Sequence, residues 1–186
     1  TADYSDQNND GTASGATFTD DSVMGLGAMS FDGSDDYIQV SSLSIAENPG
    51  TISLWFNADS ILTEGESTYQ RMTLVQYGDI YYGLQIRSSD NKIQYYMYDG
   101  SVNDWYSSDA ISTGQWYHLV AVSDATSSEM FLNGVSQGTS AITFYDNTCG
   151  ASCNFVIGGD IGGHPSGDSF DGLIDEVRIW NKALTA

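Results

Sequence analysis

Three carboxylates stand close together in the stretch FDGSDDYIQV, where an acidic turn leads into an apolar and polar alternation. Asp32, Asp35 and Asp36 fall within five residues, and Tyr37–Val40 follows with the alternation of a β-strand. Carboxylates in such a place can form a turn with neighbouring glycine, ligate a hard cation such as calcium, or act as catalytic acids and bases. The stretch by itself leaves these three alternatives open.

The two cysteines form a second candidate site, in the stretch CGASC. Cys149 and Cys153 cannot complete a zinc site without further ligands, because zinc needs three or four. A redox pair is typically found within a βαβ pattern, which the sequence lacks. We therefore expect a disulfide that closes a small loop in an exported protein.

The charge of the chain limits its partners. Only 5 Lys and Arg stand against 25 Asp and Glu, which gives a formal net charge of −20 over 186 residues. Phosphate binding depends on clustered Lys and Arg, so the composition excludes nucleic acid and disfavours an anionic membrane surface. The sequence contains no apolar run of about 18 residues, so we expect no membrane insertion.

Short β-like segments recur along the chain, separated by clusters of Gly, Asn, Asp and Ser. The clearest are TISLWF (51–56), DIYYGLQIRS (79–88), KIQYYMYD (92–99), WYHLVAVSD (116–124), NFVIGG (154–159) and LIDEVRIW (173–180). The segment 116–124 is apolar on both faces, which predicts a central buried strand. Asn133-Gly134 between two apolar pieces predicts a β-hairpin. With no helical stripe in any window, the pattern predicts an all-β, two-sheet antiparallel jelly-roll sandwich in one domain, residues 1–186.

Two of these segments present polar and aromatic side chains on what should be one sheet face. The alternation places Gln85 and Arg87 on that face in 79–88, and it places Gln94, Tyr96 and Tyr98 there in 92–99. Asn103, Asp104 and Trp105 follow at once in DGSVNDWYSS. Sugars stack on aromatic rings and exchange hydrogen bonds with planar polar groups, so these residues are candidates for a glycan-binding face. The alternative is that some of the tyrosines pack beneath a loop or beside the sheet edge.

A set of sequence blocks occurs in a familiar order. They are NNDGTASGATF, LGAMSFDGSDDYIQV, GTISLWFNAD, STGQWYHLVAVSD, MFLNGVSQG, FVIGGD and FDGLIDEVRIWNKALTA. Over nearly the whole chain they resemble the laminin-G-like jelly-roll modules of the concanavalin A-like lectin/glucanase superfamily. The resemblance implies two stacked antiparallel sheets, often a structural calcium, and in most members a non-catalytic carbohydrate-binding or adhesion role in secreted or cell-surface proteins. It does not fix a ligand.

The N-terminal part departs from the pattern of the family. Family members usually have a strand before the segment that matches Asp3–Thr12, and that strand is missing here. The chain also begins without a basic region followed by an apolar core, as a signal peptide would have, so we expect either that a signal peptide has been removed or that this is a module of a longer chain. We therefore expect a module of a larger extracellular protein, with other domains of the same chain as partners, or a different pairing of that strand.

The resemblance favours calcium for the acidic turn. In distant members of the superfamily, an acid of the last strand ligates a structural calcium together with carbonyls of a turn near the first strands. Asp175 is the matching acid, and the alternation within LIDEVRI puts it on one face with Leu173, Val177 and Ile179. An acid on an apolar face is costly unless it is paired or metal-bound. We therefore expect Asp175 and the Asp32–Gly33 turn to bind calcium, with Asp3 as a further candidate.

Catalysis is the less favoured hypothesis. The glucanase relatives carry an E-x-D-x-x-E pattern on one strand, which is absent here. His118 lies in WYHLVAV, which recurs as framework in the family, so we expect a packed core histidine. The alternatives to a carbohydrate-binding module are a protein-interaction or spacer module and a polysaccharide hydrolase or lyase. A rival binding geometry has a loop calcium that takes sugar hydroxyls directly, with the acids Asp160, Asp168 and Asp171 as candidates. His164 of the Gly-rich loop is a candidate for contact with the ligand itself.

Overall fold

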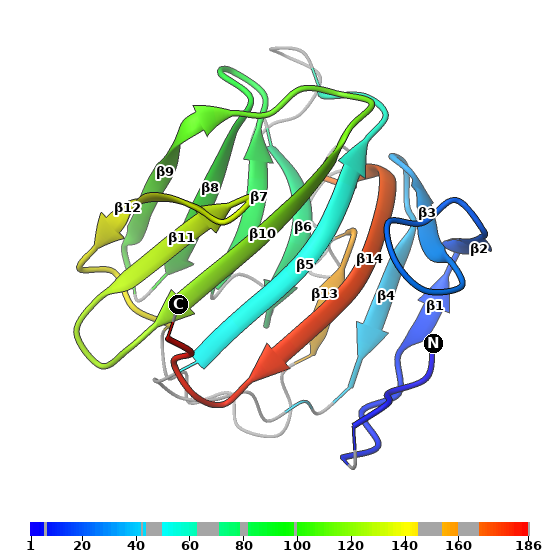
Figure 1. The fold of residues 1–186 in the computed structure, drawn as a ribbon, viewed down its shortest axis with the longest axis horizontal. Helices are drawn as coiled ribbons and strands as arrows, with labels where there is room; N and C mark the ends of the chain where they lie inside the picture. Colours follow the sequence, from blue (N-terminus) through cyan, green and yellow to red (C-terminus); the bar gives the residue numbers. More distant parts are fainter. Residues whose placement is uncertain are drawn as a thin grey trace.

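The structure is a computed structural model that describes residues 1–5, 7–41, 43, 50–62, 71–78, 82–98, 100–144, 154–159 and 168–185. Within these ranges the chain forms two antiparallel seven-stranded sheets and no helix, so the predicted all-β sandwich is confirmed. Figure 1 shows the sheets stacked, with β10, β5 and β14 of one in front of β7, β6 and β13 of the other. Across the same ranges, no helix has the length and apolarity that a membrane span needs.

The first sheet, sheet A, has the strand order β1-β4-β13-β6-β7-β8-β9. Its strands are β1 (Thr12–Ser14), β4 (Tyr37–Val40), β13 (Phe155–Ile157), β6 (Arg71–Tyr77), β7 (Tyr82–Arg87), β8 (Lys92–Tyr98) and β9 (Val102–Ala110). The strands β6 to β9 are consecutive in sequence and follow one another as an antiparallel meander.

The second sheet, sheet B, has the order β12-β11-β10-β5-β14-β3-β2. Its strands are β12 (Val135–Ser140), β11 (Ser128–Leu132), β10 (Trp116–Ser123), β5 (Gly50–Ala58), β14 (Asp171–Trp180), β3 (Ala28–Asp32) and β2 (Thr17–Thr19). The predicted hairpin joins β11 to β12. Asn133 and Gly134 have φ values of 51° and 77°, as its two-residue turn requires, and Leu132 pairs with Val135.

The core lies between the inner faces of the two sheets. Because side chains alternate along a strand, every second residue of β7 and β8 points inward, as the sequence predicts. These inward residues are Tyr82, Leu84, Ile86, Ile93, Tyr95 and Met97, and all are buried. Each large apolar side chain buried in this way contributes about 1.5–3 kcal/mol to folding. The other face of the same strands is therefore left for polar residues.

His118 is not a core residue, and that prediction is wrong. The central strand β10 alternates between buried and half-buried positions, and His118 occupies an outer position of sheet B. Its Nε2 lies 2.9 Å from the hydroxyl of Ser53, and its ring stacks on Trp55 with centroids 4.8 Å apart. The outward side of β10 is itself apolar and aromatic, which is why the sequence pattern suggested burial on both faces.

Candidate functional site

The outer face of sheet A carries a continuous set of polar and aromatic side chains across β6 to β9. Strand pairing places them in rows, with Thr73 opposite Gln85, Gln85 opposite Gln94, and Gln94 opposite Tyr106. We call this set the polar face: Arg71, Thr73, Gln76, Gln85, Arg87, Gln94, Tyr96, Tyr98, Asp104 and Tyr106. The five predicted residues of β7 and β8, from Gln85 to Tyr98, thus share one face.

Trp105 does not belong to the polar face. It pairs with Tyr95 on β8, its ring centroid lies 6.3 Å from that of Tyr95, and it packs against the core. Asp104 and Tyr106, which flank Trp105 in the sequence, point to the polar face instead. The sequence places Asp104 next to the candidate face but does not indicate Tyr106, because the polar composition of 102–110 conceals the alternation of a strand there.

The polar face has a buried part and an accessible part. Thr73 and Gln85 expose 0% and 1% of their surface, whereas Tyr98, Asp104 and Tyr106 are partly exposed. Thr73 Oγ1 and Gln85 Oε1 are buried and have no hydrogen-bond partner among the residues that the structure describes. Leaving a buried polar atom unpaired costs about 1–3 kcal/mol. A water molecule or a ligand hydroxyl that reached this row would remove that cost.

The arginines of the polar face are each engaged by an acid and an aromatic ring. Arg71 Nε lies 3.7 Å from Asp168 Oδ2, and its guanidinium sits 5.0 Å from the centroid of the Tyr96 ring. Arg87 forms an ion pair with Asp90, which holds the pKa of that carboxyl below its ordinary value mainly through the hydrogen bond. The Arg87 guanidinium also lies 3.7 Å from the centroid of Tyr106. These contacts fix the positions of two tyrosine rings.

Asp104 lies at the centre of a small hydrogen-bond network. Its Oδ2 accepts hydrogen bonds from Gln94 Nε2 at 2.8 Å and from the Tyr106 hydroxyl at 2.7 Å. Burial, followed by the hydrogen bond to Asp104, raises the pKa of Tyr106, so its hydroxyl remains a donor. The network orders side chains of β8 and β9 before any ligand arrives.

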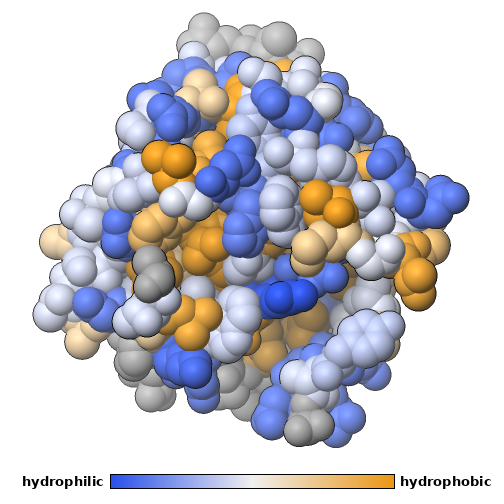
Figure 2. Space-filling model, in the orientation of Figure 1, coloured by the Kyte–Doolittle hydropathy of each residue, from blue (hydrophilic) through white to orange (hydrophobic). Residues whose placement is uncertain are grey.

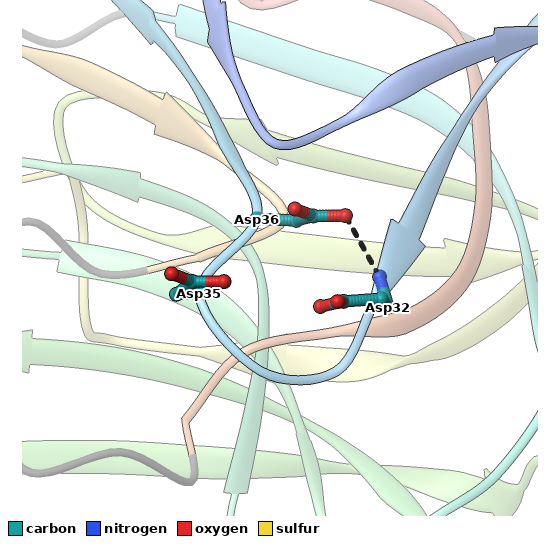
Figure 3. A group of neighbouring side chains, drawn as sticks. All are labelled: Asp32, Asp35 and Asp36. Carbon is teal, nitrogen blue, oxygen red and sulfur yellow. Dashed lines mark hydrogen bonds between the residues drawn. The ribbon is translucent and has the colours of Figure 1, made fainter.

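The acidic turn between β3 and β4 brings together the three carboxylates of FDGSDDYIQV. Asp32, Asp35 and Asp36 each offer an oxygen within 4.8 Å of the others, and Figure 3 shows Asp36 reaching across the turn to the backbone of Asp32. Asp36 accepts the Asp32 N–H at 3.0 Å, and Asp32 accepts the Ser34 N–H at 2.8 Å. Gly33, with φ of 75°, takes the left-handed conformation of the turn. Turn formation therefore accounts for part of the acidity.

The burial of Asp36 makes the cluster suitable for a cation. Asp36 is only 7% exposed, and desolvation, with the charges of Asp32 and Asp35, raises its pKa. A divalent cation would supply the opposite charge that this arrangement lacks, and carboxylate oxygens are the ligands that calcium prefers. The residues present fit such an ion.

Asp175 and the Asp32–Gly33 turn do not form one site, which corrects the predicted ligand set. The residue of β14 that pairs with Asp32 is Asp171, and Asp175 lies four positions farther along the strand. There its carboxylate accepts the Met24 N–H at 3.2 Å. A bulge at Glu176, with φ of 52°, interrupts the alternation, so Val177 and Ile179 pack on the core while Asp175 pairs with Trp55.

Asp3 is engaged within the N-terminal loop. Its carboxylate accepts the N–H of Ser5 and of Asn9, both at 2.8 Å, and the Ser5 hydroxyl at 2.7 Å. These hydrogen bonds lower the pKa of Asp3. Within the described part of the chain, Asp3 is not a member of the acidic cluster.

Four predicted residues lie outside the described part of the chain. They are Asp160 and His164 of the Gly-rich loop and Cys149 and Cys153 of the expected disulfide. The directly ligating loop calcium and the disulfide therefore stay predictions.

A family model for the concanavalin A-like lectin/glucanases superfamily matches residues 32–186. The chain belongs to this superfamily. No curated protein sequence matches the chain significantly. Among solved structures, domain 4 of AbnA, an extracellular arabinanase of Geobacillus stearothermophilus solved with arabinotriose, is similar. It has a TM-score of 0.71 and 23% identity, covering 94% of this chain and 84% of that one.

Two other solved members of the fold come from larger proteins. The binding domain of botulinum neurotoxin serotype D has a TM-score of 0.69 at 16% identity, over 99% of this chain and 46% of that one. A protein from Bacteroides ovatus, to which carbohydrate binding has been ascribed, has a TM-score of 0.65 at 20% identity, over 85% and 44%. This chain thus spans less than half the length of these two structures. Identities at this level establish the shared fold.

Proposed function

We propose that this chain is a non-catalytic carbohydrate-binding module that receives a glycan on its polar face. The observation that carries the proposal is the gathering of Tyr96, Tyr98 and Tyr106 with Gln94 and Asp104 on one sheet face. Rings stack on the CH-rich faces of sugars while amides and carboxylates meet the hydroxyls. The arabinotriose complex of the arabinanase domain and the carbohydrate binding ascribed to the Bacteroides protein support the same reading.

The accessible half of the face, over β8 and β9, is where we place the ligand. Tyr98, Asp104 and Tyr106 of these strands are partly exposed, as is Arg87 at the end of β7. The row of Thr73 and Gln85 is buried, and so are Gln94 and Tyr96. Arg87 stacked on Tyr106, and the hydrogen bonds onto Asp104, hold these groups in position. A preordered face loses less side-chain entropy on binding, which favours affinity.

A binding role fits the carboxylates of the face better than catalysis. Glycoside hydrolysis in most families needs two carboxyl groups flanking one bond. In the described rows that run from β6 to β9 through Gln94 and Tyr96, Asp104 is the only carboxylate. The acidic turn offers several carboxylates, but its buried member Asp36 packs against Gly15 and the backbone of Asp32.

We further propose that Asp32, Asp35 and Asp36 hold a structural calcium. The ion would offset the repulsion between the three carboxylates and fix the connection from β3 in sheet B to β4 in sheet A. Such a module would serve adhesion or polysaccharide targeting as part of a secreted or cell-surface protein. A net charge of −20 suits a calcium-containing medium in which like charges are bridged or screened.

A glycan array tests the proposed function. The folded chain is applied with calcium and with chelator, next to the variant Tyr98→Ala, which removes an accessible ring. We expect binding to a defined set of glycans and a loss of at least about tenfold in the variant. A folded sample that binds no glycan under either condition would refute the proposal.

A protein-interaction module is the second candidate, because apolar side chains are exposed near the edge strand β2. Phe18, Met24 and Leu26 expose 68%, 43% and 92% of their surface. Figure 2 shows apolar surface on the β2–β3 side of the molecule, among hydrophilic surroundings. Surface-immobilised chain that captures a protein partner, and loses it on Phe18→Ser with Leu26→Ser, would favour this candidate over glycan binding.

A further inference from the structure

We infer that the glycan is uncharged and that Asp104 is the residue that anchors it, by accepting hydrogen bonds from its hydroxyl groups. The inference rests on the proposed function, because it concerns the same face. Three observations carry it: the way in which Asp104 is held, the pairing of the cations around it, and the surface beside it.

Asp104 presents one carboxylate oxygen and uses the other for support. Both of its hydrogen bonds, from Gln94 and from Tyr106, end on Oδ2. Oδ1 accepts no hydrogen bond from the described residues, and the side chain is partly exposed. An ionised acceptor held in one orientation suits the O–H groups of a sugar, since hydrogen bonds to a charged group are stronger than those between neutral groups. Gln94 and Tyr106 are positioning residues in this arrangement.

The cations of the polar face are already engaged. Arg71 is paired with Asp168, and Arg87 with Asp90. Lys92 lies at the start of β8, where its charge acts on the same Asp90. A uronic acid or sulfated sugar would have to break one of these pairs to gain a counter-ion. It would also bring its charge towards Asp104 in a chain of net charge −20. Like charges brought together at an interface suppress binding.

The surface next to Asp104 suits a flat, uncharged ring. Tyr96 is opposite Asp104 in the strand register, and Gly83 is opposite Tyr96 on the other side. Gly83 is buried against β6, since a Cβ there would lie 2.8 Å from the Val75 carbonyl oxygen. Tyr96 itself is only 8% exposed, with the Arg71 guanidinium 5.0 Å from its ring centroid. The partly exposed rings of Tyr98 and Tyr106 are therefore the ones that a sugar can stack on beside Asp104.

The test compares neutral with acidic probes on the full chain. Isothermal titration is carried out with arabino-, xylo-, cello- and galacto-oligosaccharides and with oligogalacturonates, at about 50 and about 500 mM NaCl. We expect a neutral series to bind with an affinity that changes less than about twofold with salt, because no charge is exchanged. Asp104→Asn keeps the shape but removes the charge, and we expect it to weaken neutral binding by about ten- to a hundredfold.

Two controls separate charge from position. Glu129→Gln removes one negative charge from β11 of sheet B and should leave affinity unchanged. Tyr106→Phe should weaken the neutral ligand less than Asp104→Asn, because Gln94 still supports the carboxylate. Tight, salt-sensitive binding of oligogalacturonate that Asp104→Asn does not weaken would overturn the inference and leave the proposed function intact. Binding of no oligosaccharide by a folded sample would overturn both.

Discussion

Trp105 packs against the core residue Tyr95, with ring centroids 6.3 Å apart and ring planes inclined by 38°. Tyr106, the next residue, lies on the opposite face of the sheet. The two aromatic residues therefore have different roles. The first stabilises the sandwich and the second belongs to the polar face.

Trp105→Ala should destabilise the fold, whereas Tyr106→Ala should weaken binding. Trp105 is half-buried against the core, so its truncation should cost up to about 3–5 kcal/mol, the range for a buried aromatic, and should lower the melting temperature by several degrees. Tyr106 is partly exposed, so its truncation should cost far less stability. Thermal unfolding and titration with a bound glycan are measured on both variants. Equal losses of stability would contradict the assignment of the two faces.

Calcium should stabilise the chain, and Asp36→Asn should have opposite effects on stability with and without calcium. An ion bound only to the native state adds about 2.7–4 kcal/mol at a hundred- to thousandfold excess over its dissociation constant. In chelator, Asp36→Asn should raise stability, because it removes a buried charge next to Asp32 and Asp35. In calcium the same substitution should lower stability, because it removes a ligand.

The pH dependence supplies an independent check on Asp36. Its pKa is raised in the folded state above the ordinary 3.8, so the native protein binds this proton more tightly than the unfolded one. Without calcium, its contribution should therefore favour the folded state at low pH and be lost as pH rises through the folded pKa. Chemical denaturation of the parent and of Asp36→Asn between about pH 3.5 and 6.5 measures the difference. A difference that does not vary with pH would contradict the raised pKa.

His118 should titrate below the ordinary value. Burial, followed by the charge of Arg178, lowers its pKa from 6.5. A base whose folded pKa is depressed contributes stability above the unfolded value and loses it as pH falls through the folded one. NMR titration of the ring protons should show this directly, and His118→Gln should flatten stability between about pH 7 and 5. A ring that titrates above 6.5 would count against its half-buried place beside Trp55.

Gln137 joins the two sheets at their shared edge, and removing it should loosen that edge. Its Oε1 accepts the Ser108 hydroxyl and the Asp109 N–H, both at 2.9 Å, and its Nε2 donates to Asp109 Oδ2 at 3.1 Å. The residue is 5% exposed. Gln137→Ala removes these hydrogen bonds, but Ser108 and Asp109 are exposed and can turn to water, so we expect a loss of about 0.5–1.5 kcal/mol. Hydrogen exchange should quicken at the Asp109 amide, with Ser136→Ala as the neighbouring control.

The sequence predicts the sheet faces well where a strand alternates without interruption. Gln85, Gln94 and Tyr96 were assigned correctly because β7 and β8 keep their period of two from end to end. The prediction that Asp175 shares a face with Val177 and Ile179 is wrong, because the bulge at Glu176 breaks the period of two within β14. A bulge depends on the pairing of neighbouring strands, and no residue type in LIDEVRI announces it.

The residues of the acidic turn can be predicted from the sequence, whereas the hydrogen-bond network of the polar face cannot. The turn is local, so Asp32 and Gly33 were found together in one short stretch. The support of Asp104 comes from Gln94 on another strand and from Tyr106 beyond Trp105. That arrangement depends on the register of β8 with β9, including the shift between Lys92 and Gln94. Pairing register of this kind is set by tertiary structure.

Chemical-shift mapping of the ¹⁵N-labelled chain with a bound oligosaccharide tests the central claim most directly. If the glycan lies on the polar face, the largest shifts should fall on β8 and β9, at Tyr96, Tyr98, Asp104 and Tyr106. The amides of β10 and β5 on sheet B should move little. Shifts confined to sheet B, or to the loop 158–169 and dependent on calcium, with β8 and β9 unmoved, would contradict the account.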